Sequence, residues 1–134
     1  MIFQETTEGI LIRVRPSFSL VDSSPGEGRF VFTYLVEMEN KGDQEARLLY
    51  RHWRIHDAAG EDSEVNGEGV VGEQPLLDPG GTHKYKSFCV LKSPAGYMEG
   101  HYTFERADGS RFKARVPRFS FAAYLPGPAE REVH

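Results

Sequence analysis

The chain contains a single cysteine, Cys89, so it cannot form an intrachain disulfide. None of its apolar runs approaches the roughly 20 residues that a membrane-spanning helix requires, and no membrane association is predicted. The first residues, MIFQETTEG, have neither a basic start nor an apolar stretch, so no signal peptide is expected. Together these absences favour a cytoplasmic protein.

Positive charge is also scarce. Sixteen Lys and Arg residues against 20 Asp and Glu give a net charge of −4, which leaves no electrostatic footprint for nucleic-acid binding. Between Ile55 and His83 there is no Lys or Arg at all. This acidic span holds seven carboxylates: Asp57, Glu61, Asp62, Glu64, Glu68, Glu73 and Asp78. It would repel a phosphate unless a cation or a distant basic residue intervened.

No stretch of the chain shows a convincing helical period. Apolar residues instead alternate with polar ones, and strands are predicted at 10–21, 30–39, 46–57, 83–92, 100–106 and 111–121. A length of 134 residues suits one domain with a single core. Short strands with frequent Gly and Pro predict an all-β fold, an antiparallel two-sheet sandwich. Residues 1–125 are assigned to this domain and residues 126–134 to a flexible tail.

Two details of the strands can be predicted. Pro16 interrupts the first strand, which indicates an edge position or a bulge. Asp108-Gly109 lies between two alternating segments and predicts a hairpin with a type I′ turn. Arg111, Lys113 and Arg115 share one face of the last strand, and we expect that face to meet solvent.

The glycine segment, Val65–Pro75, has the spacing of a dinucleotide-binding loop at Gly67, Gly69 and Gly72. Such a loop works because it opens a helix whose N-terminus faces the pyrophosphate. Prolines at positions 75 and 79 leave no room for that helix, and no Gly-Lys-Ser/Thr follows. The glycines are therefore interpreted as shaping a loop or bulges between strands.

A set of motifs that spans most of the chain resembles the ApaG family. The motifs are Arg51-His52-Trp53, Asp57, Gly60, Glu64–Pro75, Leu77, Pro79-Gly80, Ser93-Pro94-x-Gly96-x-Met98-x-Gly100-x-Tyr102 and Val116-Pro117-x-Phe119. The resemblance covers roughly residues 9–121. It implies a fibronectin type III-like or immunoglobulin-like sandwich that acts as a binding module rather than an enzyme. It also implies an association with cobalt and magnesium tolerance, and family domains occur in F-box proteins and in polymerase-interacting proteins.

The candidate binding residues lie in and beside the glycine segment. They are Arg51, His52, Gly67, Gly69, Gly72, Glu73 and Gln74. Arg51 and His52 could line a pocket there, and an ion pair with a nearby acid is the alternative. No catalytic residue is assigned, because no nucleophile–base pattern stands out.

No metal site is assigned either. His52 and His56 stand about 13 Å apart along a strand, too far to share one ion. The acidic span could hold a divalent cation weakly, although solvated carboxylates are the default. Cys89 lies among apolar residues and is expected in the core, as is Trp53.

Two functional hypotheses remain. In the first, the domain binds another protein. In the second, it binds a small phosphorylated ligand, a polyphosphate or nucleotide, through a bridging divalent cation.

Overall fold

The computed structural model describes residues 1–124, and most of them lie in β-strands. The predicted tail, residues 126–134, lies outside the described residues. In chain order the elements are β1 (Phe3–Thr7), β2 (Ile10–Ser24), a 3-10 turn (Pro25–Glu27), β3 (Arg29–Asn40), β4 (Ala46–Asp57), β5 (Asp62–Glu68), β6 (Leu76–Leu77), β7 (Thr82–Leu91), β8 (Ala95–Glu105) and β9 (Arg111–Ala122). The all-β prediction is confirmed.

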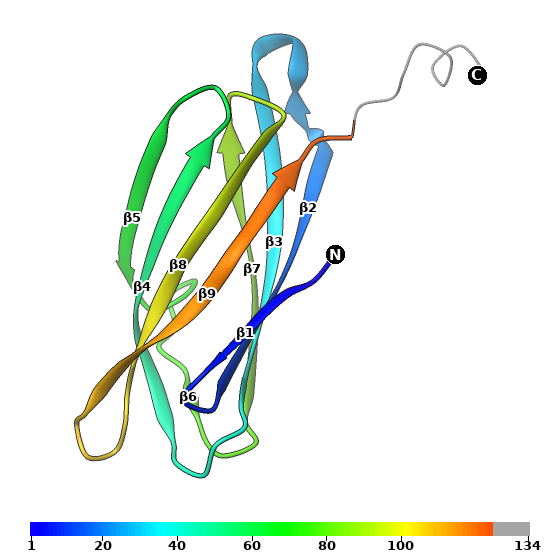
Figure 1. The fold of residues 1–134 in the computed structure, drawn as a ribbon. Helices are drawn as coiled ribbons and strands as arrows, with labels where there is room; N and C mark the ends of the chain where they lie inside the picture. The colour runs from blue at the N-terminus through cyan, green and yellow to red at the C-terminus, as the bar shows by residue number, and fades with distance from the viewer. Residues whose placement is uncertain (125–134) are drawn as a thin grey trace.

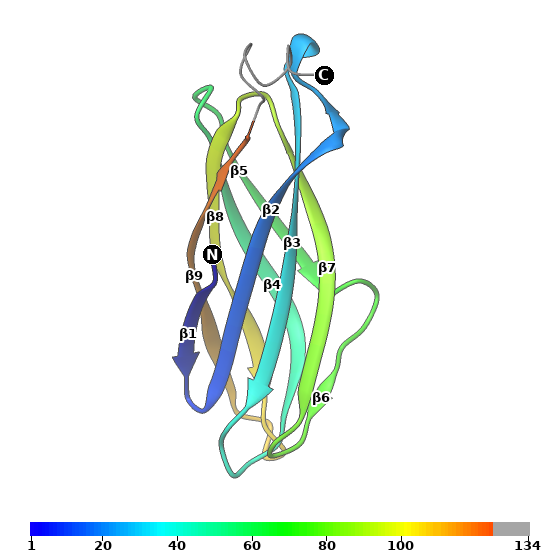
Figure 2. The same cartoon turned by 90° about the vertical axis from the view of Figure 1, so that its right-hand side faces the viewer.

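The strands form two antiparallel sheets that pack face to face (Figures 1 and 2). The first sheet has the order β1-β2-β3-β7. The second has the order β5-β4-β8-β9, and β6 pairs with the start of β4. This confirms the predicted two-sheet antiparallel sandwich.

Alternate residues of each strand supply the core between the sheets. Trp53 on β4 is 3% exposed and meets three aromatic rings edge-on or nearly so. Its ring centroid lies 5.8 Å from Tyr34, 5.7 Å from Tyr102 and 5.8 Å from Phe119. Such pairs add about 0.5–1.5 kcal/mol each beyond the burial of their surface. Trp53 is the predicted anchor that ties the two sheets together.

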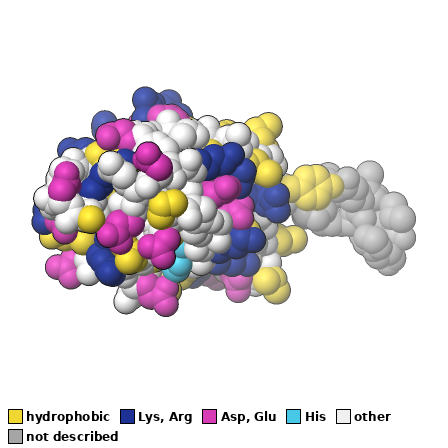
Figure 3. All heavy atoms as spheres, turned by 90° about the horizontal axis from the view of Figure 1, so that it is seen from below, with side chains coloured by type: hydrophobic (Ala, Val, Ile, Leu, Met, Phe, Trp, Pro, Cys, Tyr) yellow, Lys and Arg dark blue, Asp and Glu magenta, His cyan; other side chains and the backbone are white. Residues whose placement is uncertain are grey.

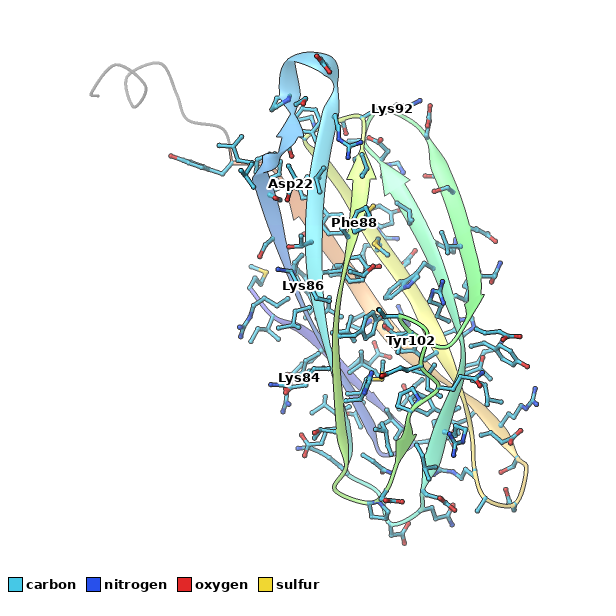
Figure 4. The ribbon with its side chains drawn as sticks, turned by 180° about the vertical axis from the view of Figure 1, so that it is seen from behind. Asp22, Lys84, Lys86, Phe88, Lys92 and Tyr102 are labelled. Carbon is cyan, nitrogen blue, oxygen red and sulfur yellow. The ribbon has the colours of Figure 1, made fainter. Side chains whose placement is uncertain are left out.

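One long side of the sandwich is closed and the other is open. On the closed side, β1 and β2 pack against β9, and the rings of Phe3 and Phe119 lie 6.5 Å apart. On the other side, β5 and β7 are the edge strands of their sheets, and each pairs with only one neighbour. Figure 4 views the molecule from behind, with β7 and β5 on either side of this opening.

The predicted Asp108-Gly109 hairpin exists, but its turn is not type I′. Gly109 has a φ of 86°, whereas Asp108 is not in the left-handed region. The loop between β8 and β9 is five residues long, 106–110, and the Asp108 carboxylate accepts the Ser110 N–H at 2.9 Å. This bond stabilises a right-handed conformation at Asp108, which the dipeptide alone did not reveal.

A two-residue turn with positive φ at both positions occurs instead at Glu8-Gly9, with φ values of 46° and 85°. It joins β1 to β2, and Thr7 pairs with Ile10 across it. The strand β1 was not predicted, because only one of its five residues is strongly apolar.

Pro16 occupies an edge position, as predicted. It lies in β2 opposite Tyr34 of β3. On its other side β1 has already ended, because the last residue of β2 that pairs with β1 is Val14. Pro16 therefore removes no ladder hydrogen bond.

The glycines were interpreted as shaping a loop or bulges between strands, and this describes Gly69 and Gly72 but not Gly67, which lies within a strand. Residues 65–68 belong to β5, which pairs with β4 in a register that sets Arg51 opposite Gly67. Most residues of β5 are exposed, because the strand lies at the edge of its sheet and beside the open side. An exposed, polar strand shows no alternation of apolar and polar residues, so it could not be predicted from the sequence.

Candidate functional site

The open groove between β5 and β7 has a volume of about 390 Å³. Ser63 and Val65 of β5 form one rim, and residues 87–91 of β7 form the other. Its floor is apolar and includes Tyr34, Trp53 and Met98. Figure 4 shows Lys84, Lys86 and Phe88 along β7 at the front, with Tyr102 between the sheets.

Arg51 lies at the groove and is held by the glycine segment. Its Nη1 donates to the carbonyl oxygens of Glu68 at 3.0 Å and Gly69 at 2.9 Å. The guanidinium covers Gly67, where a Cβ would lie only 2.6 Å from Arg51 Cζ. The absence of a side chain at Gly67 therefore leaves room for the Arg51 guanidinium.

The remaining glycines shape a tight turn. Val71 and Gly72 both have positive φ, 48° and 77°, and the N–H groups of Val70 and Glu73 each donate to the other's carbonyl oxygen. Gly69, with a φ of 61°, brings the chain into this turn. Val71 is β-branched, so its left-handed conformation is strained, and its side chain is 67% exposed.

Gln74 fixes the glycine segment to an irregularity in β4. The ladder between β4 and β8 shifts register between Leu48 and Tyr50. The freed carbonyl oxygen of Leu49 accepts from Gln74 Nε2 at 2.9 Å and from the Gly69 N–H at 2.8 Å. Gln74 therefore links the glycine segment to β4 by a hydrogen bond.

Glu73 has a partner across the groove, and Arg47 supports the same region. A carboxylate oxygen of Glu73 lies 3.6 Å from Nε2 of His83 on β7. Arg47 donates to the Gln74 carbonyl oxygen at 2.9 Å. The structure thus brings Arg51, Gly67, Gly69, Gly72, Glu73 and Gln74 together around one turn, where hydrogen bonds and an ion pair to neighbouring residues of the protein hold the turn in place.

His52 does not join this cluster. It points to the outer face of the second sheet, where its Nδ1 lies 2.6 Å from the side-chain oxygen of Asn66 and its ring stacks on His101 at 5.0 Å. Burial, Lys113 and His52 together lower the pKa of His101. Arg51 and His52 nevertheless both line a second pocket of about 370 Å³ beside Gly67, although their side chains make separate contacts because neighbouring residues on a strand face opposite ways.

His56 also has partners of its own. Its Nδ1 lies 2.5 Å from an Asp62 carboxylate oxygen, and its ring stacks on Tyr97 at 4.8 Å. No group of three or more His, Cys, Asp or Glu within residues 1–124 is placed to hold a metal ion.

Three tyrosines near the floor of the groove are kept neutral. The hydroxyls of Tyr85 and Tyr102 lie 2.5 Å apart. Burial raises the pKa of both residues, and it also raises the pKa of Tyr34. None of these hydroxyls is prepared to act as a base near neutral pH.

Asp57 lies at the end of the groove where β4 ends. Its carboxylate accepts from the Lys92 N–H at 2.7 Å, the Ser93 hydroxyl at 2.6 Å and the Ala59 N–H at 3.0 Å. Burial acts to raise the pKa of Asp57, but these hydrogen bonds outweigh it and hold the pKa below its usual value. The residue is a structural junction between the loop after β4 and the loop after β7.

Cys89 is buried, as predicted. Burial, with a contribution from Asp57, raises the pKa of its thiol to about 11. It stays protonated near neutral pH and is a poor nucleophile.

The exposed apolar side chains at the open groove were not among the predicted binding residues. Phe88 is 65% exposed and Val90 is 42% exposed, although both lie in a strand with an alternating pattern. They share a face with Lys84 and Lys86, whereas Cys89 and Leu91 point into the core. The sequence contained a signal for this exposure, because Phe88 and Val90 continue the alternate positions that the lysines occupy in the segment HKYKSFCVLK.

The comparisons with known proteins decide the family. A family model for the ApaG domain matches residues 21–106. The chain belongs to the ApaG family. This confirms the resemblance drawn from the motifs, including the glycine segment and the run from Ser93 to Tyr102.

The relatives cover nearly the whole chain. A Protein ApaG from Methylorubrum extorquens is 45% identical over 132 residues, 98% of each chain. A Protein ApaG from Anaeromyxobacter dehalogenans is 50% identical over 121 residues, 90% of this chain and 94% of the relative. A crystal structure of an ApaA protein from Bordetella pertussis is 38% identical, covers 84% of this chain and 92% of its own, and superposes with a TM-score of 0.82. Membership of the ApaG family establishes the fold of the chain, but it does not identify a specific activity.

Among the described residues of this ApaG protein, no helix is long and apolar enough to span a membrane. On the face shown in Figure 3, Lys and Arg side chains are interspersed with Asp and Glu side chains. That face offers no extended basic surface of the kind that tracks a nucleic-acid backbone.

Proposed function

We propose that this ApaG protein is a non-enzymatic protein-interaction module and that its contact surface is the open side of the sandwich, centred on β7. The observation that carries the proposal is the exposure of Phe88 and Val90 on an edge strand. Large apolar side chains beside unpaired backbone groups form a surface that favours association.

The contacts of the glycine segment support a protein partner over a phosphorylated ligand. A phosphate needs free donors, but Arg51 already donates to two carbonyl oxygens. The Val70 and Glu73 N–H groups are used within the turn. Two of the acids that could carry a bridging cation also have partners: Glu61 pairs with Lys92 at 2.8 Å and Asp62 pairs with His56.

The titratable groups at the groove support a role without catalysis. The pKa values of Tyr85 and Cys89 are raised and that of Asp57 is lowered, so none of these groups changes its protonation state near neutral pH. A general acid or base works best with a pKa near the operating pH. An association with cobalt and magnesium tolerance would then be exerted through a partner protein, in the cytoplasm.

Phe88→Lys is expected to abolish capture of the partner while leaving the fold intact. Lysine is what natural edge strands use against association, and residue 88 is already exposed. The measurement is affinity capture from lysate with quantitative mass spectrometry. We expect the specific partner to fall at least about tenfold, since loss of a central interface aromatic typically costs over 1 kcal/mol.

Val21→Lys is the matched control, because Val21 is 92% exposed on β2, away from the open groove. It should retain the partner. Equal retention by both variants, with unchanged melting temperatures, would show that β7 is not the contact surface.

A further inference from the structure

The strand β7 is paired along one side only. Its ten residues, Thr82–Leu91, follow β3 in continuous register from Glu39 to Phe30. Its other side faces the open groove, so alternate N–H and C=O groups there have no neighbouring strand. An extended peptide can satisfy such an edge by adding to the sheet.

The outward face of β7 divides into two chemically different halves. Lys84 and Lys86 occupy the first half, and Phe88 and Val90 occupy the second. Lys84 lies 3.3 Å from a Glu37 carboxylate, whereas Lys86 has no ion pair within residues 1–124. Lysines on an edge discourage general aggregation, but the apolar half carries no such protection.

We propose that an extended segment of a partner protein adds to β7 as an antiparallel strand, with two apolar residues followed by two acidic residues at alternate positions. The proposal rests on the function proposed above and names the chemistry of the partner. Running antiparallel to β7, the segment passes Val90 and Phe88 first and then Lys86 and Lys84. Its recognition pattern is therefore apolar-x-apolar-x-acid-x-acid.

The residues at the x positions point into the open groove. Ser87 and Cys89 of β7 and Val65 of β5 border it, over the floor formed by Tyr34 and Trp53. Packed sheets stand about 10 Å apart, which leaves room only for small side chains at these positions. An added strand would cover the apolar floor and supply the missing backbone partners together.

A second copy of the chain fits this edge less well. A two-fold pairing of β7 with itself, centred on Phe88, would set each Lys84 opposite the other copy's Lys92. The outward residues of β5 offer no apolar side chain to cover Phe88 and Val90: they are Asp62, Glu64, Asn66 and Glu68. Charge and apolar pattern together favour a foreign segment.

The test uses the full chain and a capped nine-residue peptide in which threonine alternates with valine, isoleucine, glutamate and glutamate, in that order. Titration followed by amide chemical shifts should show changes confined to β7 and the groove. Lys86→Glu and Phe88→Lys should each weaken binding about tenfold or more, as expected when a favourable cross-strand pair becomes unfavourable. Lys113→Glu, on the outer face of β9, should not.

Two further probes isolate the backbone pairing and the charge pairing. Of two peptides that are N-methylated at alternate positions, one should lose binding and the other keep it, because only alternate amides of an added strand face β7. A peptide with lysines in place of glutamates should bind the double variant Lys84→Glu/Lys86→Glu better than the parent.

The outcomes separate this proposal from the proposed function. No binding by the parent, or equal binding by both N-methylated peptides, would overturn strand addition. A dimer in light scattering that Phe88→Lys converts to monomer would assign the edge to a second copy and also overturn it. If Phe88→Lys still loses its captured partner while the peptide fails, the interaction surface stands and only the strand-addition mode falls.

Discussion

Replacing Gly100 by alanine is expected to lower the free energy of unfolding by about 3 kcal/mol or more, because its Cβ would overlap the backbone of β4. Gly100 pairs with Trp53 in the ladder between β4 and β8. A Cβ there would overlap the carbonyl oxygen of His52 and lie 2.9 Å from its carbonyl carbon. Backbone on the central strand of a sheet cannot move aside as a flexible side chain can.

Thermal denaturation measures this effect. For a chain of this size 3 kcal/mol corresponds to a fall in melting temperature of roughly 10 °C. Gly26→Ala is the matched control, since a Cβ at Gly26 meets nothing within 4 Å and its φ is not positive. A Gly100→Ala variant that melts within about 2 °C of the Gly26→Ala variant, the difference expected for a neutral surface substitution, would refute the tight approach of β8 to β4.

Gly69→Ala is expected to cost about 2–3 kcal/mol, more than either neighbouring glycine variant. Its φ of 61° alone costs about 1–2 kcal/mol for alanine. A Cβ at this position would also overlap the Glu73 carbonyl oxygen, which accepts the Val70 N–H. The substitution therefore strains the backbone and opens the turn.

The other two glycines provide the comparison by chemical denaturation. Gly72 has a φ of 77° but open space around it, so Gly72→Ala should cost only the backbone strain, about 1 kcal/mol. At Gly67 a Cβ would meet the side chain of Arg51. That side chain can move aside, so Gly67→Ala should cost about 1 kcal/mol for the hydrogen bonds that Arg51 loses. If Gly72→Ala is as destabilising as Gly69→Ala, the described geometry of the turn is wrong.

The sequence predicted the buried strands well because burial on one face imposes alternation. The segment 46–57 was placed with the boundaries that β4 has, and Trp53 was recognised as a core residue. Three strands were missed: β1 and β5 are largely polar and lie at sheet edges, and β6 has only two residues.

The candidate site was predicted in its location but not in its chemistry. Arg51 and Gly67 do meet, beside a pocket that His52 also lines, as the clustering of the motifs indicated. A sequence cannot show that Arg51 satisfies the carbonyl oxygens of Glu68 and Gly69, because that depends on the register of β4 and β5. The register shift near Leu49 further reverses which residues of β4 face inward, and this places His52 outside.

The exposed half of β7 could not be recognised as a surface until the order of strands was known. Phe88 would be an ordinary core residue if another strand or sheet covered its face. Only the edge position of β7 leaves its backbone and Phe88 available together.

Amide hydrogen exchange on the chain alone and in complex with its captured partner tests the central claim most directly. If the open side of the sandwich is the interaction surface, exchange should slow in β7, Thr82–Leu91, and along the facing rim of β5. The outer face of the second sheet, including β9, should exchange as in the free protein. Unchanged exchange in β7 with protection confined to β9 would contradict the account.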